Sequence, residues 1–138
     1  MNLEVDRIRE FLDKFAGKPI LLFGFTFMIW KFWKQALEKA DWWPDLSMGI
    51  LIHGGGWKKL QNEAVSTEAF REGLKQICGI EKVYNYYGMV EQTGSIFMEC
   101  EEGHLHVSQF SDILFRRSRD FSVCDVGEEG MVQVMSVL

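Results

Sequence analysis

The stretch MGILIHGGG, residues 48–56, decides the fold class, because it joins a short apolar run directly to a loop of three glycines. A helical pattern follows from Ser66, and a second strand pattern covers residues 83–87. The same order occurs upstream, where residues 19–25 hold an apolar run and Thr26 is placed to cap a helix. Repeated strand-to-helix units need crossover connections, so the sequence predicts an α/β fold with a parallel sheet.

The predicted architecture is a three-layer parallel sheet flanked by helices, with an additional short β-strand segment at the C-terminal end. Residues 1–18 form an amphipathic N-terminal helix, residues 19–94 an α/β lobe, and residues 95–138 a β-rich extension of the same domain. The run ILLF at residues 20–23 is short, uninterrupted and apolar, which is typical of a strand buried on both faces.

Composition limits the class of protein. The chain has 138 residues, of which 47% are hydrophobic, enough for the core of one globular domain. Its longest uncharged apolar stretch, residues 19–30, is shorter than the roughly 20 residues that a membrane span needs. The chain starts without an apolar signal core and has three cysteines, an odd number, so we expect a cytoplasmic protein. A net charge of −5 argues against nucleic acid as a partner.

The glycine loop is one candidate binding segment, because ligands of parallel sheets bind beyond the carboxyl ends of the strands. Gly54, Gly55 and Gly56 carry no side chains, so a flat ligand or a phosphate can approach their backbone amides closely. The loop lacks the spacing of a phosphate loop or a dinucleotide fingerprint. A tight turn without a ligand is therefore the alternative interpretation.

The segment YNYYGMVEQTG, residues 84–94, is the second candidate. An aromatic ring there can stack on a base, and the carboxylate of Glu91 can hold a hard cation. The alternative is structural: Tyr84 and Tyr86 face one layer of the core, Tyr87 faces the other, and Glu91 is solvated. The residue types alone leave both interpretations open.

Several motifs together resemble one family. YGMVE at residues 87–91 resembles the Tyr-Gly-x-Thr-Glu motif of the acyl-adenylating superfamily. GFTFM at 24–28, HGGGWKKL at 53–60, the run from Tyr87 to Cys100 and GHLH at 103–106 resemble its acyl-protein synthetase (LuxE) branch. The motifs occur in the family's order over nearly the whole chain from Pro19 onward, which makes their combination more specific than any one of them.

The resemblance implies roles for the matching residues. Tyr87 would stack on adenine opposite the glycine loop, and Glu91 would ligate the Mg²⁺ bound to ATP. The other implied ATP-binding residues are Gly54, Gly55, Gly56, Asn85, Tyr86 and Gly88. The implied acyl-pocket residues, close to the carboxylate or acyl chain, are Phe25, Thr26 and His53. Val90 stands where the superfamily has threonine, so a hydroxyl contact to phosphate is missing there, and Thr93 and Ser95 are candidates to supply it.

The implied function is part of an ATP-dependent acyl-protein synthetase. Such an enzyme activates a fatty or other carboxylic acid as an acyl-adenylate and transfers it to a thiol, which makes an acyl reductase or an acyl carrier a candidate partner. The superfamily's upstream phosphate loop, acidic ribose motif and C-terminal lysine are missing from this sequence. We therefore expect an internal fragment of a longer enzyme, inactive alone. The alternative is a non-catalytic nucleotide- or partner-binding α/β module that self-associates, and exposed truncation surfaces predict a homo-oligomer.

Three other groups of residues suggest sites. Cys100, His104 and His106 resemble a partial zinc site, but structural zinc takes four ligands, so packing around a turn is the default. Cys78 and Cys124 have no base beside them in sequence, which argues against either as a nucleophile. Finally, the pair Trp42-Trp43 is a candidate for acyl-pocket lining, with a place in the core as the alternative.

Overall fold

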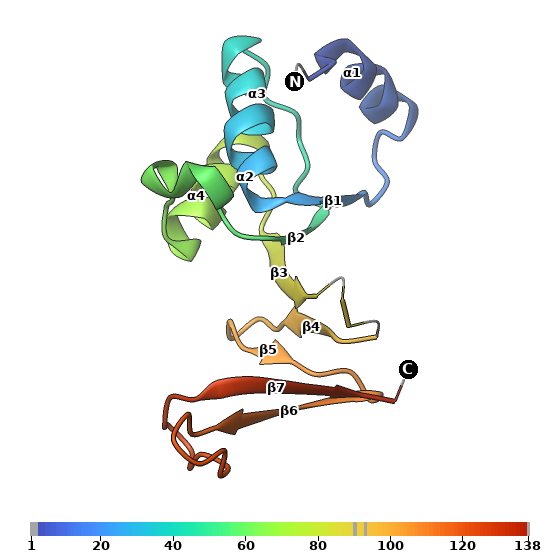
Figure 1. Ribbon diagram of the computed structural model, residues 1–138. Helices are drawn as coiled ribbons and strands as arrows, with labels where there is room; N and C mark the ends of the chain where they lie inside the picture. The colour runs from blue at the N-terminus through green and yellow to red at the C-terminus, as the bar shows by residue number, and fades with distance from the viewer. Residues whose placement is uncertain (1–2, 90, 93, 138) are drawn as a thin grey trace. The chain divides into compact units, whose positions relative to one another are not determined.

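The computed structural model describes residues 3–89, 91–92 and 94–137. Its contacts divide the chain into two compact units, Met1–Asn85 and Tyr86–Leu138, with strand β3 running through the division (Figure 1). A five-stranded sheet has the order β1-β2-β3-β4-β5, and β6 and β7 form a second sheet. The protein is thus a mixed α/β fold.

The first unit begins with the amphipathic helix α1 (Val5–Lys14). The helix is shorter than the predicted span of residues 1–18: it ends at Lys14, Phe15 caps it, and Gly17 follows with a left-handed φ of 73°. Strands β1 (Leu21–Phe25) and β2 (Ile50–Gly54) then pair in parallel, with Leu21 opposite Ile50 and Phe25 opposite Gly54. This confirms the parallel crossover predicted for the first two strands.

One long helical segment connects β1 to β2. It comprises α2 (Thr26–Met28), a π-helical turn (Ile29–Lys34) and α3 (Gln35–Lys39). A 3₁₀ helix (Lys58–Glu63) and α4 (Thr67–Cys78) follow β2. Figure 1 shows the helices of this unit gathered around β1 and β2.

Helix α4 illustrates how local sequence sets an element. Ser66 is its N-cap and accepts a hydrogen bond from the Ala69 backbone N–H at 3.2 Å, and Gly79 ends the helix with a left-handed φ of 70°. The apolar side of α4 enters the core of the first unit. The buried core residues are Ile29, Leu37, Leu46, Leu51, Phe70, Leu74, Ile77, Cys78, Ile80 and Val83.

The second unit is built from strands. After β3 (Lys82–Gly88) come β4 (Ile96–Glu99), β5 (Leu105–His106), β6 (Ser111–Arg116) and β7 (Met131–Ser136). The last four of these strands lie within residues 95–138, where the sequence predicts a β-rich extension. Because β3 pairs with β4 and β4 with β5 in antiparallel orientation, the five-stranded sheet is mixed instead of wholly parallel.

Two expectations for the first strand and helix are wrong. Leu21 and Phe23 are 66% and 69% exposed, so β1 is not buried on both faces. β1 lies at the edge of the sheet, and the described elements leave the alternate residues of this strand uncovered. Thr26 begins α2 without capping it, because its hydroxyl binds elsewhere.

Among residues 3–89, 91–92 and 94–137, no helix has the length and apolar character required to cross a bilayer.

Candidate functional site

A cavity of about 220 Å³ lies beside the glycine loop within the first unit; we call it the glycine-loop cavity. It brings together residues from β1–α2, the end of β2, the start of α4 and β3. Five residues predicted for the acyl or ATP site line it: Thr26, His53, Gly55, Gly56 and Asn85. Segments distant in the sequence thus meet around one cavity.

A hydrogen-bond chain fixes the imidazole at this cavity. The Thr26 hydroxyl donates to the Gly54 carbonyl at 3.2 Å and lies 2.9 Å from His53 Nδ1. Since the hydroxyl has one proton, Nδ1–H of His53 must donate to Thr26 Oγ1. A neutral His53 therefore carries its lone pair on Nε2. His53 is 5% exposed and Thr26 9%, so this arrangement is shielded from solvent.

Aromatic side chains form the apolar part of the cavity lining. The Phe70 ring lies 4.6 Å from the His53 ring and 6.4 Å from the Trp57 ring, measured between centroids. Trp30 packs behind them, with its ring centroid 5.7 Å from that of Phe70. The cavity therefore combines an apolar wall with an imidazole, an amide and backbone groups, a composition typical of small-molecule sites.

The loop glycines differ in what they tolerate. Gly55 has a left-handed φ of 71°, which favours glycine, and a Cβ there would make a tight contact with the Phe25 ring at 3.3 Å. At Gly56 a Cβ would meet nothing within 4 Å. The absence of a side chain at Gly56 thus has no explanation in the packing of the described residues.

The start of α4 also borders the cavity, through Ser66 and Thr67. This helix terminus favours negative charge: the backbone N–H of Glu68 and the Ser66 side chain hold the pKa of the Glu68 carboxyl below its ordinary value. The polar groups at this helix terminus thereby find partners among the terminus's own residues.

Gly54 ends β2 in the first unit and is not among the residues that line the cavity, and the remaining predicted ATP-site residues lie in the second unit. Tyr87 is 46% exposed and its ring centroid lies 6.0 Å from that of Phe97, its cross-strand partner. Tyr86 is half-buried, whereas Gly88 and Glu91 are exposed. The exposure of the Tyr87 ring and the Glu91 carboxylate is compatible with a ligand-binding role and equally with plain solvent exposure.

Backbone hydrogen bonds hold the loop after β3. The N–H of Gln92 donates to the Met89 carbonyl and that of Ser95 to the Gln92 carbonyl. Ser95 is 1% exposed, and its hydroxyl has no hydrogen-bond partner among the described residues. Val90 and Thr93, named above for the missing phosphate contact, lie outside the described residues.

Phe25, the third predicted acyl-pocket residue, lines a different cavity. This α1–β1 cavity has a volume of about 590 Å³ and lies between α1, β1 and the π-helical turn. The sequence pattern does not predict this cavity. The sequence does show apolar faces on three consecutive elements, but the pattern does not indicate that a space remains between these faces.

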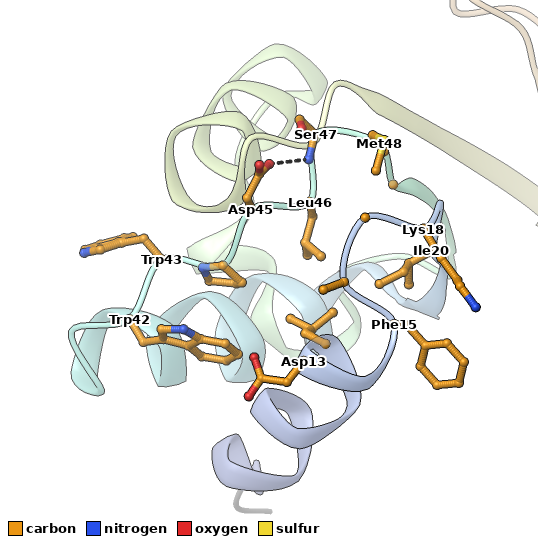
Figure 2. A pocket seen from close by; sticks show the side chains of 15 residues that line it. Asp13, Phe15, Lys18, Ile20, Trp42, Trp43, Asp45, Leu46, Ser47 and Met48 are labelled. Carbon is orange, nitrogen blue, oxygen red and sulfur yellow. Dashed lines mark hydrogen bonds between the residues drawn. The ribbon is translucent and has the colours of Figure 1, made fainter.

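A third cavity, of about 370 Å³, is drawn in Figure 2 and involves the Trp42-Trp43 segment. Trp42 lies next to Asp13 there, and its ring stacks with the Arg9 guanidinium at 4.9 Å. The backbone N–H and the side chain of Ser47 hold the pKa of the Asp45 carboxyl below its ordinary value. Trp42 packs against the core, whereas Trp43 is 53% exposed.

The cysteine and histidine candidates give no site. The residues that the structure describes contain no cluster of three His, Cys, Asp or Glu side chains able to hold a metal ion, and Cys100, His104 and His106 are no exception. Burial raises the pKa of the Cys78 thiol to about 11, so this thiol stays protonated at neutral pH. Cys78 is therefore a core residue.

Comparisons with known proteins add family evidence. The family model described as "Acyl-protein synthetase, LuxE" matches residues 2–138. A search of curated protein sequences finds no significant match.

Among solved structures, the chain resembles apo MatB from Rhodopseudomonas palustris, with a TM-score of 0.59 and 16% identity over 93% of this chain and 24% of that one. It also resembles the luciferase-like enzyme from the nonluminescent mealworm Zophobas morio, with a TM-score of 0.63 and 18% identity over 98% of this chain and 32% of that one. These similarities show the fold, and the chain spans about a quarter to a third of those proteins. Because the family model covers nearly the whole sequence, the chain belongs to the LuxE acyl-protein synthetase family.

Proposed function

We propose that this chain is the nucleotide- and acyl-binding part of an ATP-dependent acyl-protein synthetase. The observation that carries the proposal is the glycine-loop cavity, where residues predicted separately for the acid and for ATP share one lining. Membership of the LuxE family supports the reaction class.

The proposed reaction has two steps. A carboxylate oxygen attacks the α-phosphorus of ATP, which releases pyrophosphate and forms an acyl-adenylate. A thiol sulfur then attacks the acyl carbonyl, forms a thioester and releases AMP, while the thiol proton goes to solvent or a base. Positioning and electrostatic stabilisation are the main contributions that a protein makes to such phosphorus chemistry.

The cavity residues have distinct proposed tasks. The amides of Gly55 and Gly56 border the space for a flat or anionic group, and Asn85 adds an amide. His53, fixed by Thr26, orients the group that binds beside it. Tyr87 lies in the second unit and does not line this cavity; its exposed ring keeps the adenine-stacking role that the family resemblance implies. In the intact enzyme, we expect Phe25 to contact the acyl chain.

The residues present fit Mg²⁺ in one specific way. Mg²⁺ commonly uses one or two carboxylates together with substrate phosphates and water, not an all-protein cage. Glu91 is an exposed carboxylate in a turn, and the described residues offer no cluster of three acidic or imidazole ligands. Glu91 would therefore be a single protein ligand to an ion held mainly by ATP, whose charge it would help to neutralise.

AMP formation, nucleotide binding and self-association of the purified chain test this proposal against its rival. We expect the 138-residue chain to bind nucleotide but to produce no AMP in the presence of ATP, Mg²⁺ and carboxylic acids, because it spans about a quarter to a third of the solved structures that it resembles. The exposed apolar residues of β1 favour the rival, a self-associating binding module. Carboxylate-dependent AMP release by the chain alone would overturn the view that it lacks essential parts. Concentration-dependent dimerisation without nucleotide binding would support the rival.

Glu91→Gln tests the metal role in a full-length synthetase that carries this sequence. The substitution keeps size and removes charge, so we expect adenylation to fall roughly 100-fold or more with the thermal midpoint unchanged. Glu101→Gln, at another exposed acid of the same unit, is the matched control and should leave the rate unchanged. Full magnesium-dependent activity of Glu91→Gln would show that Glu91 is a solvated acid.

A further inference from the structure

Thr26 lies where the two groups of predicted site residues meet. The family resemblance places Thr26 and His53 near the acyl chain and the loop glycines near ATP. Thr26 contacts both groups, because its hydroxyl lies 2.9 Å from His53 Nδ1 and donates to the Gly54 carbonyl at 3.2 Å. One side chain thus joins the imidazole to the glycine loop.

The junction of β1 and α2 contacts the glycine loop at two successive residues. Phe25, the last residue of β1, pairs with Gly54, the last residue of β2. The Phe25 ring lies directly against the loop, since a Cβ on Gly55 would be 3.3 Å from it. The Thr26 hydroxyl adds its hydrogen bond to Gly54 one residue further along. These two contacts continue the packing of β1 on β2 into the start of the loop.

Burial makes the Thr26 hydroxyl costly to lose. Thr26 and His53 are both buried, so water has little access to their polar groups. Without the hydroxyl, His53 Nδ1–H and the Gly54 carbonyl would each lose this partner, and a buried polar group that loses its partner keeps its desolvation cost. The imidazole or the loop would then have to move to recover a hydrogen bond.

The loop has more room to move than the imidazole has. The Phe70 ring lies 4.6 Å from the His53 ring, measured between centroids, and restricts it. At Gly56, by contrast, a Cβ would meet nothing within 4 Å. Loss of the Thr26 hydroxyl should therefore displace mainly the glycine loop.

We propose that Thr26 is a positioning residue for the nucleotide side of the site, where its hydroxyl acts through Gly54 and His53 to hold the glycine loop in its ATP-binding conformation. This role deepens the proposed function and rests on it, because the loop is the segment assigned to ATP. It differs from the acyl-pocket role that the resemblance implies for Thr26, since it makes nucleotide affinity depend on the Thr26 hydroxyl.

Thr26→Val and Thr26→Ser in the 138-residue chain test this role. Valine has nearly the shape of threonine and lacks the hydroxyl, so Thr26→Val should bind MgATP about fivefold more weakly, the effect of one ordinary hydrogen bond. Serine keeps the hydroxyl, so Thr26→Ser should bind MgATP as the wild type does. Ile77→Val is the control, because Ile77 is a buried core residue that does not line the glycine-loop cavity, and its loss of a methylene should leave the affinity unchanged.

Two NMR measurements on the nucleotide-free, ¹⁵N-labelled chain give readouts that a merely structural role would not move. At about pH 8, above the ordinary histidine pKa, the imidazole nitrogens of the wild type should show His53 as the Nδ1–H tautomer. The amide signals of Gly55 and Gly56 should shift in Thr26→Val, return in Thr26→Ser and stay in place in Ile77→Val. The wild-type tautomer needs no variant, so it tests the proposal even if Thr26→Val fails to fold.

The outcomes separate this role from the proposed function. An Nε2–H tautomer in the wild type, unmoved Gly55 and Gly56 signals in Thr26→Val, or unchanged MgATP affinity of that variant would overturn the role of Thr26. A wild-type chain that binds no MgATP, while its glycine signals respond to Thr26→Val as expected, would contradict the proposed function and leave Thr26 as the residue that positions the loop.

Discussion

The two units of the chain hold themselves together by different means. All ten residues of the hydrophobic core belong to Met1–Asn85. Among the described residues of Tyr86–Leu138, Ser95 and Phe97 are the buried ones, and large apolar side chains such as Phe110 and Phe121 are 55% and 62% exposed. The second unit depends instead on strand pairing and polar contacts.

Polar contacts are dense around Arg117 in the second unit. Its guanidinium donates to the Val123 carbonyl at 2.7 Å and pairs with Asp125 at 2.8 Å and with Glu128. Exposed ion pairs contribute little to stability, and a two-stranded sheet such as β6–β7 is marginal alone. Apolar burial therefore stabilises the first unit, whereas the second unit has little apolar burial.

The largest expected difference comes from removing apolar side chains in the two units. Leu51 is 0% exposed in β2, so Leu51→Ala should lower the free energy of unfolding by about 2–5 kcal/mol. Val132 is 53% exposed in β7, and Val132→Ala should change it by less than about 0.5 kcal/mol. Urea unfolding followed by circular dichroism measures both. A large effect at Val132 and a small one at Leu51 would reverse the comparison.

A smaller contrast comes from the same substitution at two serines. Ser66→Ala removes the N-cap of α4 and should destabilise the fold by about 0.5–2 kcal/mol. Ser95→Ala removes a buried hydroxyl that has no partner among the described residues, so stability should stay unchanged or rise. Thermal denaturation of both variants checks the opposite signs. Clear destabilisation by Ser95→Ala would mean that its hydroxyl has a partner in solution.

The smallest effect concerns pH in the second unit. The Arg117 guanidinium and the Asp125 backbone N–H hold the pKa of the Glu128 carboxyl below its ordinary value. Because the folded pKa is lowered, this contact stabilises the fold above the ordinary glutamate pKa of about 4.3 and is lost as pH falls through the folded value. Arg117→Gln should return the Glu128 pKa towards ordinary, as a carboxyl ¹³C titration would show. An equal pKa in both proteins would contradict the assigned cause.

Much of the fold follows from local signals in the sequence. Both ends of α4 were predictable, because capping by Ser66 and helix termination at Gly79 depend on residues within one turn of each end. The four strands of the last third were predictable from their spacing and their turns. The exposure of β1 was not, because a strand's burial depends on elements that lie elsewhere in the chain.

The candidate site is predicted only through the family resemblance. The resemblance implies an acyl-pocket role for His53 and ATP-binding roles for Gly55, Gly56 and Asn85, and these four residues line one cavity. The bond between Thr26 and His53 was not predictable, because an N-terminal helix position suggests capping and the competing partner is 27 residues away. The α1–β1 cavity likewise depends on how three apolar faces pack, which periodicity does not encode.

MgATP binding by the chain and by its Gly56→Ala variant tests whether the glycine loop contacts the nucleotide. Space for a Cβ exists at Gly56, and alanine restricts the unfolded chain, so the variant should be as stable as the wild type or about 0.4–1 kcal/mol more stable. If the glycine loop contacts the nucleotide, millimolar MgATP should shift the Gly55 and Gly56 amide signals of the wild type, and Gly56→Ala should bind severalfold more weakly despite its stability. Undiminished MgATP binding by a stable Gly56→Ala variant, or wild-type signals that do not respond, would contradict the account.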